Sequence, residues 1–199
     1  MHAAQARAST YSGLLMKHTD SALARLARRL DQVAIWSGRL TCWLLLPLVL
    51  GLTYEVVARY AFNAPTMWAY DLTFMLYGTF FMLGAAFTLQ RKGHVRTDML
   101  YERWSPRQQA TIDLVCYVLI FLPFLYVLIV TGWGYFWKAF VTTETFVSSA
   151  WQPITWPFKL AVPLAGVLLL IQGISEVLKC VHALRNNSWP DTRASESGA

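Results

Sequence analysis

Three ionisable residues near one turn of the chain are the first candidates for chemistry. Glu55 and Arg59 stand four residues apart at the end of one apolar segment, and Asp71 stands at the start of the next. The four-residue spacing places Glu55 and Arg59 on one helix face, where they can form an ion pair. Arg59 and Asp71 lie almost symmetrically about the turn. We therefore expect them to face each other. With Glu55 they would clamp the two segments together, contact a partner protein or, as the least favoured role, relay ions or protons.

A second polar group, His94, Arg96 and Asp98, follows the second apolar segment in a basic stretch. One histidine with one carboxylate is too few ligands for a typical zinc site and thin evidence for an acid and base pair. We expect a structural role instead, in which Asp98 caps the following helix or pairs with Arg96.

The remaining residue patterns predict neither an enzyme nor a cofactor. The three cysteines, Cys42, Cys116 and Cys180, form no Cys-x-x-Cys motif and are expected to be free thiols. All four histidines lie outside the apolar segments, so a haem site within a membrane would lack axial ligands. The chain shows neither a nucleotide-binding glycine-rich loop nor a recognisable set of nucleophile, base and orienting residue.

The elements that must position these residues are four long apolar segments, at about 40–60, 68–89, 112–137 and 157–178. At about 1.5 Å of rise per residue, each can cross a hydrocarbon layer of roughly 30 Å. The chain is 56% hydrophobic, contains nine tryptophans and has a mean hydropathy of +0.39, which is more apolar than a soluble domain of this size. We therefore predict an all-α membrane protein with four transmembrane helices.

Prolines and small residues add detail to these segments. Pro47, Pro123 and Pro163 lie inside the first, third and fourth segments, where each removes a backbone hydrogen bond and is expected to bend the helix. Small residues, which allow helices to approach closely, occur at Gly84, Ala85 and Thr88, and again at Gly132 and Gly134.

The two ends of the chain are polar. We expect residues 1–19 to be a mobile segment, 20–178 to form the membrane domain, and 179–199 to be a polar tail. Residues 20–36 carry apolar side chains at helical spacing opposite several arginines, a pattern typical of an amphipathic helix lying in the membrane interface. The alternative is a solvated helix that packs on a protein partner.

The charge distribution predicts an orientation. Of the 17 lysines and arginines, six precede the first segment, five lie between the second and third, and three follow the fourth. The three others, Arg59, Lys138 and Lys159, belong to the opposite side. This bias predicts that both termini face the cytoplasm of a bacterial inner membrane, next to anionic lipid. The net charge of +6 is thus sorted by loop, and we expect no nucleic-acid partner.

Several short motifs occur in a characteristic order. They are Arg59-Tyr60-Ala61-Phe62-Asn63-Ala64-Pro65, then Trp68 with Asp71, then Gly84-Ala85-Ala86, then His94-Val95-Arg96-Thr97-Asp98, and finally Trp151 to Pro157, with Trp156 and Pro157 at the entry to the last segment. Over about residues 40–178 the chain resembles the small membrane subunit of tripartite ATP-independent periplasmic (TRAP) transporters, the DctQ-like family. Asp71 stands where that family usually has a glutamate.

The resemblance implies two protein partners and a transport role. A DctQ-like subunit works with a larger DctM-like membrane subunit, which carries the substrate and sodium sites and moves as an elevator, and with a soluble DctP-like periplasmic binding protein. It implies uptake of an organic acid, typically a carboxylate, driven by an ion gradient. The structural or partner-contact candidates are Glu55, Arg59, Asn63, Pro65, Trp68, Asp71, Gly84, His94, Arg96, Asp98, Trp156 and Pro157.

Two other functions remain open from the sequence. The first is a small proton-coupled multidrug-type exporter, in which Glu55 is the proton-carrying acid and two copies form the pathway. The strong charge bias and the pairing of Glu55 with Arg59 count against it. The second is a membrane anchor of a redox complex, which the positions of the histidines disfavour.

Overall fold

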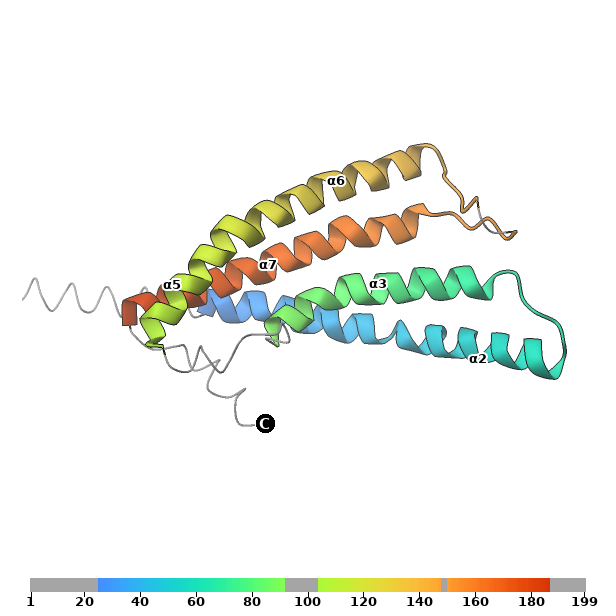
Figure 1. The fold of residues 1–199 in the computed structure, drawn as a ribbon, viewed down its shortest axis with the longest axis horizontal. Coiled ribbons are helices and arrows are strands. Elements are labelled where there is room, and N and C mark those ends of the chain that lie inside the picture. Colours follow the sequence, from blue (N-terminus) through green and yellow to red (C-terminus); the bar gives the residue numbers. More distant parts are fainter. Residues whose placement is uncertain (1–24, 92–103, 148–149, 187–199) are drawn as a thin grey trace, which may run out of the picture. The chain divides into compact units, whose positions relative to one another are not determined.

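The computed structural model describes residues 25–91, 104–147 and 150–186, and these residues are almost entirely helical. The prediction of an all-α fold is confirmed. The elements are a helix over residues 25–42, α2 (Leu45–Ala61), α3 (Ala69–Gln90), α5 (Pro106–Cys116), the π-helix η1 (Tyr117–Phe121), α6 (Leu122–Val141) and α7 (Trp156–Asn186) (Figure 1).

Within the described residues, four helical stretches are long and apolar enough to cross a membrane, as predicted. They are Arg25–Ala61, Ala69–Gln90, Arg107–Val141 and Trp156–Arg185. Their bounds are wider than the apolar segments of the sequence: the last helix continues eight residues past the expected end at 178.

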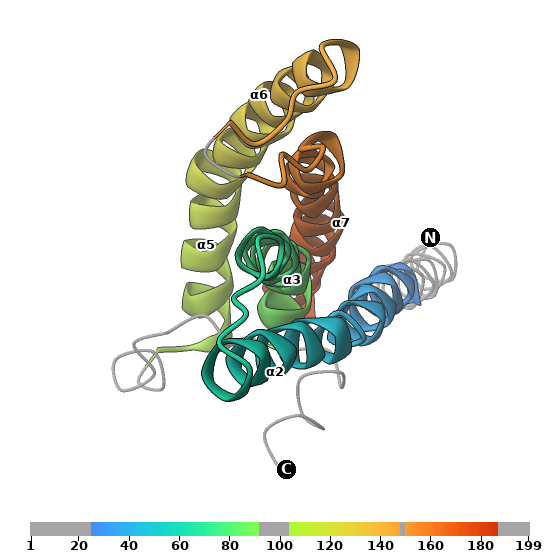
Figure 2. The same ribbon diagram turned by 90° about the vertical axis from the view of Figure 1, so that its right-hand side faces the viewer.

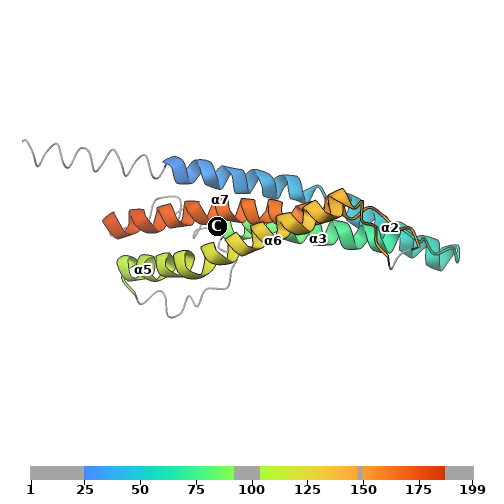
Figure 3. The same ribbon diagram turned by 90° about the horizontal axis from the view of Figure 1, so that it is seen from above.

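The prolines mark where two of these stretches change geometry. Pro47 lies in the first turn of α2, where its missing N–H is least needed, and the two-residue turn of Trp43 and Leu44 precedes it. Figure 3 shows this stretch from above. Pro123 lies just after the π-helix η1. Because proline cannot donate a hydrogen bond to the carbonyl four residues earlier, the backbone before it adopts the wider π-helical turn. Pro163 lies inside α7.

The described residues form two compact units. The larger unit comprises residues 33–91 and 122–172, and thus holds α2, α3, α6 and the first part of α7. In it α2 packs along α3, and Figure 2 shows this pair viewed near its axis. Glycines admit bulky neighbours there: a Cβ on Gly78 would lie 2.6 Å from the ring of Phe158, and one on Gly166 would lie 2.7 Å from Ile129.

The smaller unit comprises residues 25–32, 104–121 and 173–186. Its α5 begins with a capping box, in which the Ser105 side chain accepts from the backbone N–H of Gln108 and the Gln108 side chain accepts in return. Small side chains then allow α5 to pack closely against α7. The buried cluster consists of Ala110, Cys180 and Ala183, with Leu114, Tyr117 and Leu184 against it.

The helix over residues 25–42 buries small and polar side chains rather than its large apolar ones. Ala27, Asp31 and Ala34 are at most 6% exposed, whereas Leu26 and Val33 are 47% and 41% exposed. The predicted amphipathic stretch at 20–36 is thus helical in its described part. Its placement in the membrane interface stays a prediction.

Candidate functional site

The carboxylate of Glu55 is the centre of a hydrogen-bonded cluster near the end of α2. Its Oε1 accepts from Arg59 Nε at 2.9 Å and also from Arg59 Nη2. Its Oε2 accepts from the backbone N–H of Thr66 at 3.0 Å and also from the Thr66 hydroxyl. The predicted pairing of Glu55 with Arg59 is confirmed, and Glu55 is only 9% exposed.

The expected pairing of Arg59 with Asp71 stays a prediction. Arg59 directs its bonds to Glu55 on its own helix. Asp71 lies on the first turn of α3, where it is 6% exposed. The four-residue spacing brings Glu55 within reach of Arg59. The loop is therefore joined to α2 through Glu55 and Thr66.

The backbone of this loop explains how Thr66 returns to Glu55. Asn63 adopts a left-handed conformation with φ of 51°, which asparagine tolerates better than most residues, two residues after α2 ends at Ala61. The N–H of Ala64 then donates to the carbonyl of Ala58 at 3.0 Å. Trp68 stacks on Tyr54 with ring centroids 5.8 Å apart. Of the sequence candidates, Asn63 thus has a backbone role and Trp68 a packing role.

A second ion pair fixes the loop between α6 and α7, and sequence reasoning missed it. Lys159 is 6% exposed and donates to Glu144 at 2.7 Å, while its Nζ lies 4.0 Å from the ring centroid of Tyr135. Thr155 donates through its N–H and its hydroxyl to the carbonyl of Glu144, both at 2.9 Å. The loop is therefore braced by hydrogen bonds just before Trp156 begins α7.

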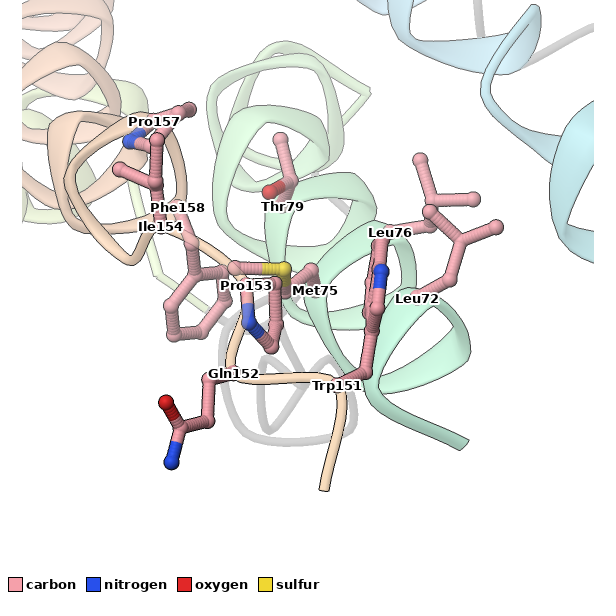
Figure 4. Close-up of a pocket in the computed structure, with 10 residues that line it drawn as sticks. All are labelled: Leu72, Met75, Leu76, Thr79, Trp151, Gln152, Pro153, Ile154, Pro157 and Phe158. Atoms are coloured by element: carbon pink, nitrogen blue, oxygen red, sulfur yellow. The ribbon is translucent and has the colours of Figure 1, made fainter. Parts of the chain in front are cut away.

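A pocket of about 580 Å³ lies between this loop and α3. Figure 4 shows the ring of Trp151 beside Leu72 and Leu76, and the Gln152 side chain directed away from them. Pro157, another sequence candidate, also lines the pocket, and its lining is mainly apolar. No polar constellation suited to a hydrophilic substrate is evident among the side chains that line it.

A third cluster lies in the smaller unit and joins residues far apart in the sequence. The ammonium of Lys179 lies 2.8 Å from Asp31 Oδ2 and 2.7 Å from Glu176 Oε1. The hydroxyl of Ser175 is 2.7 Å from Asp31 Oδ1. All four residues are at most 6% exposed. No local sequence pattern identifies Asp31 and Lys179 as neighbours of Glu176.

The other sequence candidates are placed as follows. Gly84 has open space at the position of a Cβ, as has Gly134, whereas a Cβ on Gly132 would meet Val162 at 3.0 Å. Pro65 lies exposed in the loop after α2. His94, Arg96 and Asp98 lie outside the described residues. Across residues 25–91, 104–147 and 150–186, no group of three or more potential ligands is placed to hold a metal ion.

In each of these clusters, charged side chains are bonded to neighbouring residues on or beside apolar helices. Comparison with known proteins identifies the family of the chain. The model of the family described as "Tripartite ATP-independent periplasmic transporters, DctQ component" matches residues 48–183. The chain belongs to the DctQ family.

A curated relative agrees with this assignment. Over 88 residues the chain is 31% identical to the C4-dicarboxylate TRAP transporter small permease protein DctQ of Vibrio cholerae serotype O1. The aligned part is 44% of this chain and 37% of the length of that relative. As a DctQ family member with four apolar helices, the chain is a multi-pass inner-membrane component of a TRAP transporter.

Proposed function

We propose that this chain is the fixed small permease subunit against which a larger DctM-like subunit moves its substrate. The observation that carries the proposal is the family match combined with the surface of the bundle. Large apolar side chains are exposed along both α2 and α6, among them Leu50, Tyr54, Tyr126 and Trp133. Such surfaces suit lipid and a partner helix rather than water.

The buried charges support a static role. In the described spans Glu55, Lys159 and Lys179 are each bonded to side chains of this same chain. The proton-coupled exporter needs an acid that can exchange its proton with substrate, but the Glu55 carboxylate already accepts bonds from Arg59 and Thr66. That acid is better suited to hold a loop than to carry protons.

The orientation follows from the charge bias and can be tested directly. We propose that both termini are cytoplasmic and that the loops 62–68 and 142–155 face the periplasm. Single cysteines at Asn63 and Thr97, in a background without the native cysteines, should differ in labelling by an impermeant thiol reagent on intact cells. Labelling at position 63 alone is expected. Strong labelling at 97 with none at 63 would reverse the topology.

The periplasmic end is the proposed receiving surface for a DctP-like binding protein. The loop between α6 and α7 is suited to this because the pair of Glu144 and Lys159 ties the start of the loop to the first turn of α7, which reduces the ordering needed on docking. The substrate class we propose is an organic acid, since the relative from Vibrio cholerae is named for C4-dicarboxylates. Transport would use an ion gradient, with any sodium bound on the large subunit.

Co-purification tests the scaffold assignment. The tagged chain, expressed with the large subunit and extracted in a mild detergent, should elute as a complex of fixed stoichiometry. A Gly84→Leu variant adds bulk at a position on α3 where a Cβ would meet no atom of this chain. Gly51→Leu on α2 makes the same substitution at a position where the Cβ would already meet Leu72 of this chain at 3.9 Å, and it is the control. If the tagged chain elutes alone or as a homodimer under conditions that preserve the large subunit, the scaffold assignment is wrong.

A further inference from the structure

A second pocket, of about 300 Å³, lies between α2 and α3 close to the loop that joins them. The residues that line it change from apolar to polar along the helix axis. Leu52 and Val56 line one part of it, and Arg59, Tyr60 and Tyr70 line the part nearest the loop. The two tyrosines are 82% and 79% exposed, so this part of the pocket lies at the surface of the protein.

The guanidinium of Arg59 is held in position at this pocket. Its Nε and Nη2 are bonded to Glu55, whose other oxygen is bonded to Thr66. These contacts leave the Nη1 amino group for a ligand, and the Arg59 side chain is 55% exposed. A positioned guanidinium loses little conformational entropy when it binds an oxyanion, and its planar fork matches phosphate geometry.

The height of the pocket in the membrane restricts what the ligand can be. Helices α2 and α3 are both candidate spans, so the ends at which Arg59 and Tyr70 lie are at the level of lipid headgroups. The pair of Arg59 with Glu55 is neutral overall and attracts a free anion weakly at long range. A ligand with an apolar part gains further contact with Leu52 and Val56. A lipid phosphate with its acyl chain meets both requirements.

We propose that this pocket binds one phospholipid molecule, with the phosphate at Arg59, the headgroup between Tyr60 and Tyr70, and an acyl chain along Leu52 and Val56. The site is separate from the scaffold role and does not depend on it. It makes the lipid a part of the folded subunit at the loop that joins α2 and α3.

Native mass spectrometry of the purified full-length chain tests this site. The chain in detergent is titrated with phosphatidylglycerol, with a diacylglycerol that has the same acyl chains but no phosphate, and with inorganic phosphate. One retained phosphatidylglycerol is expected, with an apparent Kd at least about tenfold lower than that of the diacylglycerol, the effect of one charge-assisted hydrogen bond. Its Kd should also be lower than that of inorganic phosphate, which lacks the acyl chains. Equal binding of diacylglycerol would overturn the role of Arg59. Equal binding of inorganic phosphate would overturn the role of the acyl chain.

Variants locate the lipid. Arg59→Gln should weaken phosphatidylglycerol binding about tenfold. Because this change also disturbs Glu55, a second variant, Leu52→Trp, fills the pocket while leaving the ion pair in place, and it should abolish the retained lipid. Lys138→Gln removes an exposed cation from the last turn of α6 and is the matched control. If neither pocket variant differs from Lys138→Gln, the proposal is wrong. If the pocket variants keep the lipid but no longer co-purify with the large subunit, the pocket is a protein contact and the proposal is wrong.

Discussion

Replacing Lys179 with methionine should destabilise the folded chain by about 3 kcal/mol, because the ammonium is removed from between two buried carboxylates. Its nitrogen lies 2.8 Å from Asp31 and 2.7 Å from Glu176, and the three side chains are 6%, 9% and 2% exposed, respectively. Breaking a buried ion pair on one side costs about 3–5 kcal/mol, since the other charge is left uncompensated. The lower end applies here because Ser175 still bonds to Asp31.

The assay is denaturant unfolding of the purified chain in mixed micelles, followed by circular dichroism. Lys138→Met is the control, because Lys138 is an exposed lysine whose loss should leave stability nearly unchanged. A double-mutant cycle with Asp31→Asn isolates the pair, and the double variant should be less destabilised than the sum of the single variants. A cost for Lys179→Met no larger than that for Lys138→Met, together with zero coupling, would refute the account of this cluster.

Two further changes test the larger unit. Thr66→Val removes a hydroxyl bonded to Glu55 and should lower the melting temperature more than Thr142→Val does. The Thr142 hydroxyl is exposed and bonds only to the carbonyl of Lys138, four residues earlier. Equal melting temperatures of the two variants would show that the loop is not held through Glu55. Gly134→Ala should raise the stability of the fold by up to about 1 kcal/mol through helix propensity. Gly132→Ala should raise stability less or lower it, because its Cβ would meet Val162 at 3.0 Å and the backbone of Pro163 at 3.3 Å. The reverse order of stabilities in thermal unfolding would contradict the described contact of α6 with α7.

The sequence predicted those features that depend on short-range spacing. The four spans follow from the length of their apolar runs, and the bond between Glu55 and Arg59 follows from a four-residue repeat on a helix. The short turn before Pro47 and the π-helical turn before Pro123 follow from the missing proline N–H, although the sequence did not predict which geometry would result.

The contacts that were missed join residues whose proximity depends on tertiary packing. Asp31 and Lys179 are 148 positions apart, and no local pattern distinguishes either from an ordinary surface charge. The charge pattern of the sequence assigns Lys159 only to one side of the membrane, whereas folding of the loop brings Glu144 within hydrogen-bonding distance of it. Tertiary packing also accompanies the continuation of α7 past 178, where Lys179 is buried and paired with Asp31 and Glu176.

We propose, as a consequence of the fixed-subunit role, that this chain transports nothing by itself and yet is required for uptake. The most direct measurement is gradient-driven uptake of a radiolabelled dicarboxylate into proteoliposomes that contain the large subunit, with the binding protein outside, prepared with and without this chain. The account predicts uptake only when all three proteins are present, and none with this chain alone. Uptake by this chain alone, or unchanged uptake when it is omitted, would contradict the account.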